Sequence, residues 1–223
     1  YTTLFRSPVL ANLFLHYVFD DYMSREFPNI PWVRYADDGA LNCVSLKQAK
    51  YIIKVLDKRF KLFGLELNLT KTKIVYCKDN NRKGNYENIK FDFLGYTFRP
   101  REAMDKNGNI FISFLPAISD KAQKAIREEV RSWRLQAKTE RSIEQIAEMY
   151  NSKIRGWINY YTHYYASAIT GVMMYINKCI CKWVKRKYKQ TSKWKAIKWL
   201  NKMVKIKANL FAHWKIGIIS TAV

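Results

Sequence analysis

The 223 residues include 40 Lys or Arg against 18 Asp or Glu, a formal net charge of +22, and 48% of the side chains are hydrophobic. This composition excludes a wholly disordered chain and suits one or two compact domains. No stretch is long and apolar enough to span a bilayer; the richest, residues 9–19, fits a buried helix better.

The positive charge is concentrated in the second half of the chain. Residues 1–118 carry 18 basic and 12 acidic side chains, whereas residues 119–223 carry 22 and 6, and no Asp or Glu follows Met149. A folded surface of one sign indicates a polyanionic partner. We favour nucleic acid over an anionic membrane surface. The four cysteines lack zinc-ligand spacing and are expected to be reduced thiols in a cytoplasmic protein.

The first half alternates between helical and strand patterns. Ser45 is a predicted helix N-cap, Gly64 ends the same helix, and Asn107-Gly108 is a hairpin turn signal. The predicted elements, in chain order, are a helix at 9–27, a hairpin at 32–44, a helix at 46–63, strands at 66–68, 73–77 and 90–99, and a hairpin at 101–114.

Pro116 is the predicted domain boundary, because the hydrophobic period changes there from two to 3.6. The sequence therefore predicts an α+β chain with one domain at 1–115 and a helical, basic domain at 116–223. The predicted helices of the second domain span about 119–138, 142–164, 168–189 and 193–204.

Tyr35-Ala36-Asp37-Asp38 lies in the first predicted hairpin and places two carboxylates side by side. Adjacent negative charges favour a shared cation, and Mg²⁺ prefers carboxylate oxygens while leaving room for substrate phosphates. Two-metal phosphoryl transfer requires such an arrangement. The alternative is a solvated Asp-Asp-Gly turn, which is common.

A basic helical face is the second candidate site. Residues three and four apart lie on one side of a helix, so we expect a contact surface for RNA formed by Lys178, Lys182, Lys185, Arg186 and Lys189. Arg155 and neighbouring aromatic residues suit phosphate binding and stacking on unpaired bases. The alternative is that Trp157, Tyr161 and Tyr164 belong to the helical core. His16 and His213 are expected to be packed rather than catalytic.

In this order the motifs resemble those of reverse transcriptase–maturases encoded by group II introns. The resemblance covers nearly the whole chain and rests on residues 7–15, 35–38, 64–73, 91–98, 154–161 and 210–214. It implies an incomplete reverse-transcriptase palm, an antiparallel sheet with helices, followed by an α-helical maturase thumb. It also implies an RNA-directed DNA polymerase and splicing maturase in the bacterial cytoplasm, with group II intron RNA and a primer–template as partners.

The resemblance implies roles for individual residues. Asp37 and Asp38 would be the catalytic ligands of Mg²⁺, Tyr35 would shape the primer site, and Lys71 would lie near the phosphates of the incoming nucleotide. The primer grip would comprise Phe93, Leu94, Gly95 and Tyr96. Gly95 indicates a close backbone approach, which is to the primer end in the family but also fits a bulge in a core strand.

The chain departs from the family pattern at its start, where residues 1–6 replace a glycine-bearing motif. The family's metal site uses a third carboxylate from an upstream strand, and Asp20 and Asp21 are badly placed to substitute. We therefore expect the chain alone to bind RNA but not to polymerise DNA. A missing N-terminal half or a dimer partner could supply the rest. The alternatives are a non-enzymatic intron RNA chaperone and a decayed basic RNA-binding remnant.

Overall fold

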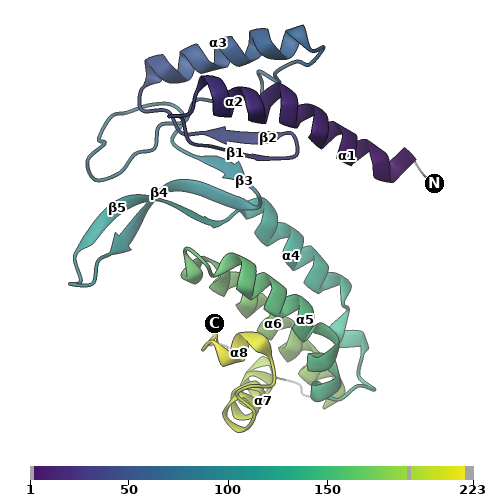
Figure 1. The fold of residues 1–223 in the computed structure, drawn as a ribbon. Coiled ribbons are helices and arrows are strands. Elements are labelled where there is room, and N and C mark those ends of the chain that lie inside the picture. The colour runs from purple at the N-terminus through teal and green to yellow at the C-terminus, as the bar shows by residue number, and fades with distance from the viewer. Residues whose placement is uncertain (1–2, 190–191, 219–223) are drawn as a thin grey trace. The chain divides into compact units, whose positions relative to one another are not determined.

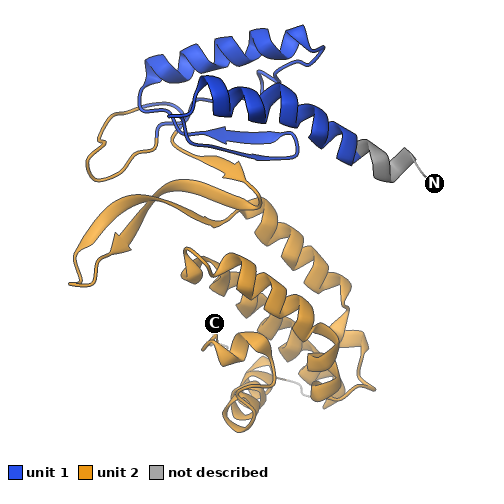
Figure 2. Cartoon of the chain, viewed as in Figure 1, with its two compact units in different colours: residues 1–76, 86–88 blue, residues 77–85, 89–223 orange. Residues whose placement is uncertain are grey.

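The computed structural model describes residues 3–189 and 192–218, without the side chains of residues 3–7. It is of the mixed α+β class, as predicted, with small antiparallel sheets and several helices (Figure 1). The chain forms two compact units, shown in Figure 2: unit 1 comprises residues 1–76 and 86–88, and unit 2 comprises residues 77–85 and 89–223. The units are described separately below.

Unit 1 consists of a long helix, a hairpin and a second helix. In chain order its elements are α1 (Thr3–Leu15), the π-helical segment η1 (His16–Asp20), α2 (Asp21–Glu26), β1 (Trp32–Tyr35), β2 (Asp38–Leu41) and α3 (Leu46–Leu62). The first three run on continuously, because the residues at their junctions keep helical backbone angles. A small core holds the unit together, formed by the buried side chains Phe19, Met23, Ile30, Ile52 and Leu56.

The expectation that residues 9–19 form a buried helix is wrong for most of that stretch. Val18 and Phe19 are buried, but Val9 is 67% exposed and Tyr17 63%. Only the C-terminal part of the helix packs against the core of unit 1. Apolar composition alone therefore did not show which of its residues are buried. His16 was expected in the core for the same reason, and it is exposed beside Asp20.

α3 forms as its sequence predicts. The Ser45 hydroxyl accepts a hydrogen bond from the Gln48 amide, and Gly64 follows the helix with a φ of +70°. The predicted strands at 66–68 and 73–77 are absent from the described residues between α3 and β3. The main-chain bonds around Asn68 are local, so no neighbouring strand completes a ladder there.

Unit 2 begins with an antiparallel sheet in the order β3–β4–β5. Its strands are β3 (Phe91–Phe93), β4 (Tyr96–Met104) and β5 (Ile110–Ile118). The single strand predicted at 90–99 is therefore wrong: Leu94 and Gly95 have φ values of +49° and +78° and reverse the chain. Two successive positive φ values match a tight hairpin turn, and Phe93 pairs with Tyr96 across it.

The helices of unit 2 follow the sheet. They are α4 (Asp120–Ser132), the 3₁₀ segment η2 (Leu135–Ala137), α5 (Ile143–Tyr161), the 3₁₀ segment η3 (Ala166–Ile169), α6 (Thr170–Lys187), α7 (Lys193–Ile206) and α8 (Ala212–Lys215). Serine hydroxyls cap α4, α5 and α7, and Ser142 with Gln145 forms a full capping box. α4 ends earlier than the helix predicted at 119–138, because Arg134 adopts a left-handed conformation.

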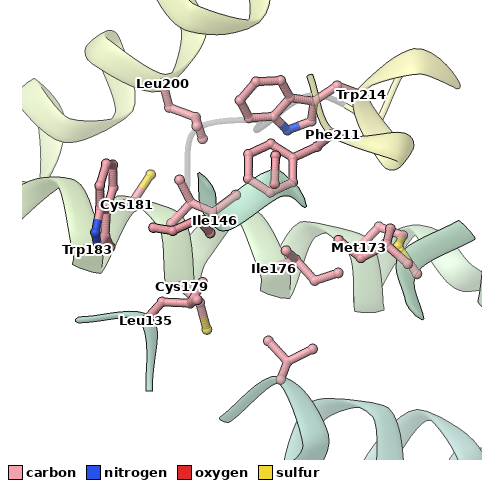
Figure 3. Packing of buried hydrophobic residues seen from close by; sticks show 14 of the residues in the cluster. Leu135, Ile146, Met173, Ile176, Cys179, Cys181, Trp183, Leu200, Phe211 and Trp214 are labelled. Carbon is pink, nitrogen blue, oxygen red and sulfur yellow. The ribbon is translucent and has the colours of Figure 1, made fainter. Parts of the chain in front are cut away.

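α6 lies at the centre of the hydrophobic core of unit 2, part of which Figure 3 shows. Met173, Ile176 and Trp183 on this helix are fully buried, and Phe211 and Trp214 pack into the same cluster. The buried cysteines at 179 and 181 are free thiols. No described helix is long and apolar enough to cross a membrane.

The compact units do not coincide with the two predicted domains. The predicted boundary follows residue 115, whereas strands β3–β5 group with the helices in unit 2. The Ser119 amide donates to the Gly95 carbonyl at 2.9 Å, so the start of α4 is bonded directly to the β3–β4 turn. The assignment of residues 1–115 and 116–223 to separate domains stays a prediction.

Candidate functional site

The first candidate site is the β1–β2 hairpin. Tyr35 pairs with Asp38, so Ala36 and Asp37 form the two-residue turn, and Asp38 is the first residue of β2. Asp38-Gly39, although Asp-Gly is a common hairpin-turn pair, lies in β2 and not in the turn. Asp37 and Asp38 are exposed, and Tyr35 is 64% exposed. All three predicted site residues are therefore open to solvent at one end of the hairpin.

The donor chemistry of this turn fits a hard divalent cation in part. Neither Asp37 nor Asp38 forms an ion pair with a described cationic side chain, so four carboxylate oxygens are free to bind a ligand. However, the described residues contain no group of three or more His, Cys, Asp or Glu side chains that could hold a metal ion. The pair can supply ligands to a magnesium site but does not complete one.

Arg34 connects the hairpin to the helix that begins unit 1. Its Nε and Nη2 atoms donate to the two carboxylate oxygens of Asp20 at 2.7 and 2.6 Å. The hydrogen bond from Arg34 lowers the pKa of Asp20. Asp20 is thus engaged in an ion pair with Arg34.

Lys71 lies in a turn that follows α3 in unit 1. The Asn68 side chain organises this turn, since its Oδ1 accepts hydrogen bonds from the Thr70 hydroxyl and the Lys71 amide. The Lys71 side chain is exposed. Its predicted role at a nucleotide phosphate stays a prediction.

The predicted primer-grip residues form the β3–β4 hairpin turn in unit 2. The Tyr160 hydroxyl donates to the Leu94 carbonyl at 2.8 Å. A Cβ atom added to Gly95 would lie 2.9 Å from the Tyr161 hydroxyl oxygen. The close approach that Gly95 indicated in the sequence is therefore present, and the group that approaches is a side chain of α5.

A cluster of tyrosines surrounds this turn. Tyr96 is buried, its hydroxyl donates to the Tyr160 carbonyl, and burial raises its pKa, so it remains a neutral donor. Its ring centroid lies 5.2 Å from that of Tyr160, 5.4 Å from Tyr161 and 5.6 Å from Tyr164. Tyr164 remains 60% exposed. These rings therefore join the sheet to α5, and Tyr164 also presents an open aromatic face.

The second candidate site is the basic face of α6. Lys178, Lys182 and Arg186 are exposed, Lys185 is half-buried, and none of the four is paired with a described carboxylate. Lys189 lies beyond the end of the helix at Lys187 and has a φ of +50°, so its predicted place on the helical face is wrong. The face that remains is a row of cations one helical turn apart.

Arg155 is exposed on α5, whereas the tryptophan two residues later is packed. The Trp157 ring stacks on Trp133 with centroids 5.7 Å apart and an interplanar angle of 8°, and Tyr150 stacks on the same ring at 4.1 Å. Trp157 is thus part of the helical packing, as the alternative interpretation held. Arg155 stays a candidate for phosphate contact.

Sequence reasoning missed a second basic row, on α7. Four exposed lysines recur there at intervals of three and four residues, Lys195, Lys198, Lys202 and Lys205. With Trp199 and Asn201 they line an open surface hollow. Three of these lysines lie within the helix predicted at 193–204, so their spacing could have identified the row from the sequence.

Comparison with protein families identifies both parts of the chain. Residues 4–98 match the reverse transcriptase (RNA-dependent DNA polymerase) family, and residues 123–201 match the group II intron maturase-specific domain. The matches cover the Tyr-Ala-Asp-Asp hairpin and the basic face of α6 respectively. No curated protein matches the chain.

The fold and the two matches together define a protein with a reverse-transcriptase region followed by a maturase region. The chain belongs to the family of group II intron-encoded reverse transcriptase–maturases. This is the family that the order of its sequence motifs indicated.

Proposed function

We propose that unit 2 binds group II intron RNA through the basic face of α6, with Arg155 and the α7 lysines extending the surface. The observation that carries this proposal is the row of cations on α6 that has no carboxylate partner among the described residues. Like charges on one helical face repel one another, and RNA phosphates would relieve that repulsion. The match to the maturase-specific domain supports intron RNA as the polyanion.

The test is fluorescence anisotropy with labelled group II intron RNA at several salt concentrations. We expect a triple variant, Lys178→Gln with Lys182→Gln and Arg186→Gln, to lower the slope of log affinity against log salt by about 2. The matched control replaces Lys50, Lys54 and Lys58 by Gln, because these exposed lysines have the same spacing of four residues on α3 in unit 1. Equal losses in the two triple variants would contradict a specific role for α6.

We propose further that unit 1 contributes Asp37 and Asp38 to RNA-directed DNA synthesis. Its support is the pair of exposed, unpaired carboxylates within a region that matches reverse transcriptases. Bound Mg²⁺ would stabilise negative charge on the transferring phosphate and its leaving group. Asp37 and Asp38 would hold the ion, Tyr35 would shape the primer site, and Lys71 would meet nucleotide phosphates.

Because two carboxylates do not complete the metal site, we expect no DNA synthesis by this chain alone. Primer extension on an RNA template, with and without an upstream reverse-transcriptase segment added in trans, tests this directly. Extension that requires the added segment and disappears in Asp37→Asn supports the proposal. Robust extension by the chain alone, or extension indifferent to Asp37→Asn, contradicts it.

A non-enzymatic role as an RNA chaperone for intron splicing needs only unit 2, and the exposed basic rows favour it specifically. It differs from a decayed RNA-binding remnant in selectivity. A chaperone of this family would bind folded intron RNA more tightly than unrelated RNA of equal length, whereas a remnant held by charge alone would bind both alike.

A further inference from the structure

Arg34 makes four hydrogen bonds, three to side chains of the first helix and one to the Tyr-Ala-Asp-Asp turn. Besides the two bonds to Asp20, its Nη1 atom donates to the Asn12 side-chain oxygen at 3.0 Å and to the Ala36 carbonyl at 2.8 Å. These bonds use four of the five N–H donors of a guanidinium group. Arg34 therefore fixes the hairpin turn relative to one long helix.

The helix departs from regular α-helical geometry where it meets Arg34. Asp20 is the last residue of the π-helical segment η1, and wider turns of this kind are rare within α-helices and frequent at functional sites. The side chains of Arg34 and Asp20 are only 13% and 16% exposed. A charged pair so largely removed from water is costly unless its geometry is well satisfied, and here both carboxylate oxygens are engaged.

Ala36 is the residue that needs support. Its φ of +53° lies in the left-handed region, which is unfavourable for residues with a Cβ atom. Two-residue hairpin turns normally place glycine or asparagine at this first position. The chain has alanine there, and Arg34 bonds to the carbonyl of that same residue.

We propose that Arg34 is a positioning residue for the carboxylate pair. By holding the Ala36 carbonyl it stabilises the left-handed conformation of Ala36, and this conformation sets the directions in which Asp37 and Asp38 leave the turn. The inference rests on the proposed role of these two carboxylates as metal ligands. It assigns to Asp20 and Asn12 the task of holding Arg34.

Lysine cannot replace arginine in this role. A lysine ammonium has three donors at one point, whereas the planar guanidinium reaches Asp20 on one side and the Ala36 carbonyl on the other. Glycine at position 36 would occupy the left-handed region without the penalty of a Cβ atom. The need for Arg34 should therefore shrink when Ala36 is replaced by glycine.

The experiment compares Arg34→Lys, Ala36→Gly and the double variant in the full chain. The first readout is NMR of residue 36, whose Cα shift and H–N–Cα–H coupling report its backbone conformation. We expect a left-handed signature in the parent chain and its loss in Arg34→Lys. Arg25→Lys is the matched control, since Arg25 is an exposed arginine whose ion pairs lie on α2. Unchanged amide signals from unit 2 verify that each variant is folded.

The second readout is terbium luminescence sensitised by Tyr35, which measures ion binding without catalysis. We expect Arg34→Lys to weaken the Asp37-dependent binding of terbium by about tenfold. A loss of this size corresponds to the cost of holding an alanine in the left-handed conformation. Ala36→Gly should recover most of that loss in the Arg34→Lys background and change little in the parent chain. If Arg34 only joined the hairpin to the helix, Ala36→Gly would not recover terbium binding in the Arg34→Lys background.

The two readouts separate the inference from the proposed function. If residue 36 keeps its left-handed signature in Arg34→Lys, or glycine has the same effect in both backgrounds, the inference is wrong. If terbium emission is unaffected by Asp37→Asn and Asp38→Asn, the metal-binding role of the turn is wrong. In that case the NMR comparison still decides what Arg34 does.

Discussion

The Tyr160 hydroxyl donates a 2.8 Å hydrogen bond to the carbonyl of Leu94, which precedes it by 66 residues. This bond joins the C-terminal end of α5 to the β3–β4 turn, at the point where Tyr161 also approaches Gly95. The predicted primer-grip turn is therefore held by a helix of the maturase-specific region. A substitution in the turn or in α5 should therefore weaken the contact between them.

Gly95→Ala should destabilise unit 2 by about 2–3 kcal/mol. The substitution combines backbone strain at a φ of +78° with a contact of 2.9 Å to the Tyr161 hydroxyl. Gly108→Ala is the control, because Gly108 has a φ of +85° but no atom within 4 Å of an added Cβ. We expect about 1 kcal/mol for that variant, both measured by urea unfolding.

Adding Tyr161→Phe to Gly95→Ala separates strain from steric contact. Removal of the hydroxyl should recover the steric share of the loss and leave the backbone share. Equal destabilisation by Gly95→Ala and Gly108→Ala would mean that the approach of Tyr161 has no energetic consequence.

Tyr160→Phe should cost about 1 kcal/mol, the net value of a typical hydrogen bond, since the Leu94 carbonyl loses its donor. Tyr164→Phe is the matched control, because that ring also contacts Tyr96 but its hydroxyl makes no hydrogen bond with a described residue. Urea unfolding followed by circular dichroism measures both. If the two variants are equally stable, the bond contributes nothing to the fold.

The buried His213 side chain should make the stability of unit 2 depend on pH. The ring is buried, its Nε2 atom lies 2.7 Å from the Asn177 side-chain oxygen, and its Nδ1 atom has no hydrogen-bond partner among the described residues. Burial lowers the pKa of His213 from 6.5 to about 3. Because the unfolded chain binds the proton first, this contribution to stability is complete above about pH 6.5 and is lost as the pH falls towards 3.

We expect His213→Gln to flatten the decline between pH 6.5 and 5, since a glutamine amide can still donate to Asn177 but does not titrate in this range. Lowered carboxyl pKa values, such as that of Glu144 at about 2, act only at lower pH. Urea unfolding at half-unit steps of pH gives the measurement. A parent chain whose stability is constant from pH 7 to 5 would contradict the prediction.

The α7 lysines should contribute to RNA binding in addition to α6. Replacing Lys195, Lys198 and Lys202 by Gln removes three exposed cations beside the hollow lined by Trp199. We expect the salt dependence of RNA binding to fall by about 2 in log–log slope, as for the α6 variant. An affinity unchanged at every salt concentration would exclude α7 from the interface.

Local signals in the sequence predicted local structure well. Ser45 was predicted as an N-cap, and two further helices were predicted to begin at about 119 and 142. The hydroxyls of Ser45, Ser119 and Ser142 each accept a capping hydrogen bond from the backbone. The Asn107-Gly108 turn also lies where the sequence placed it. These features depend on side chains within four residues of the backbone they bind, so no distant partner is needed to predict them.

Features that depend on distant partners were not predicted. The apolar residues around Val9 suggested burial but are exposed, because burial requires a facing surface that composition does not reveal. The bonds from Arg34 to Asp20 and from Tyr160 to Leu94 join residues 14 and 66 positions apart. The turn at Leu94 was missed for a local reason: a leucine at positive φ is rare, and the signal came only from the following glycine.

We propose above all that unit 2 recognises group II intron RNA through its basic helical faces. A competition titration tests it most directly: labelled intron RNA is displaced from the full chain by unlabelled intron RNA or by unrelated structured RNA of equal length, at physiological salt. We predict that the intron RNA competes at least about tenfold more effectively, and that the α6 triple variant loses affinity for both. Equal competition by the two RNAs, with affinity unchanged in the α6 variant, would contradict the account.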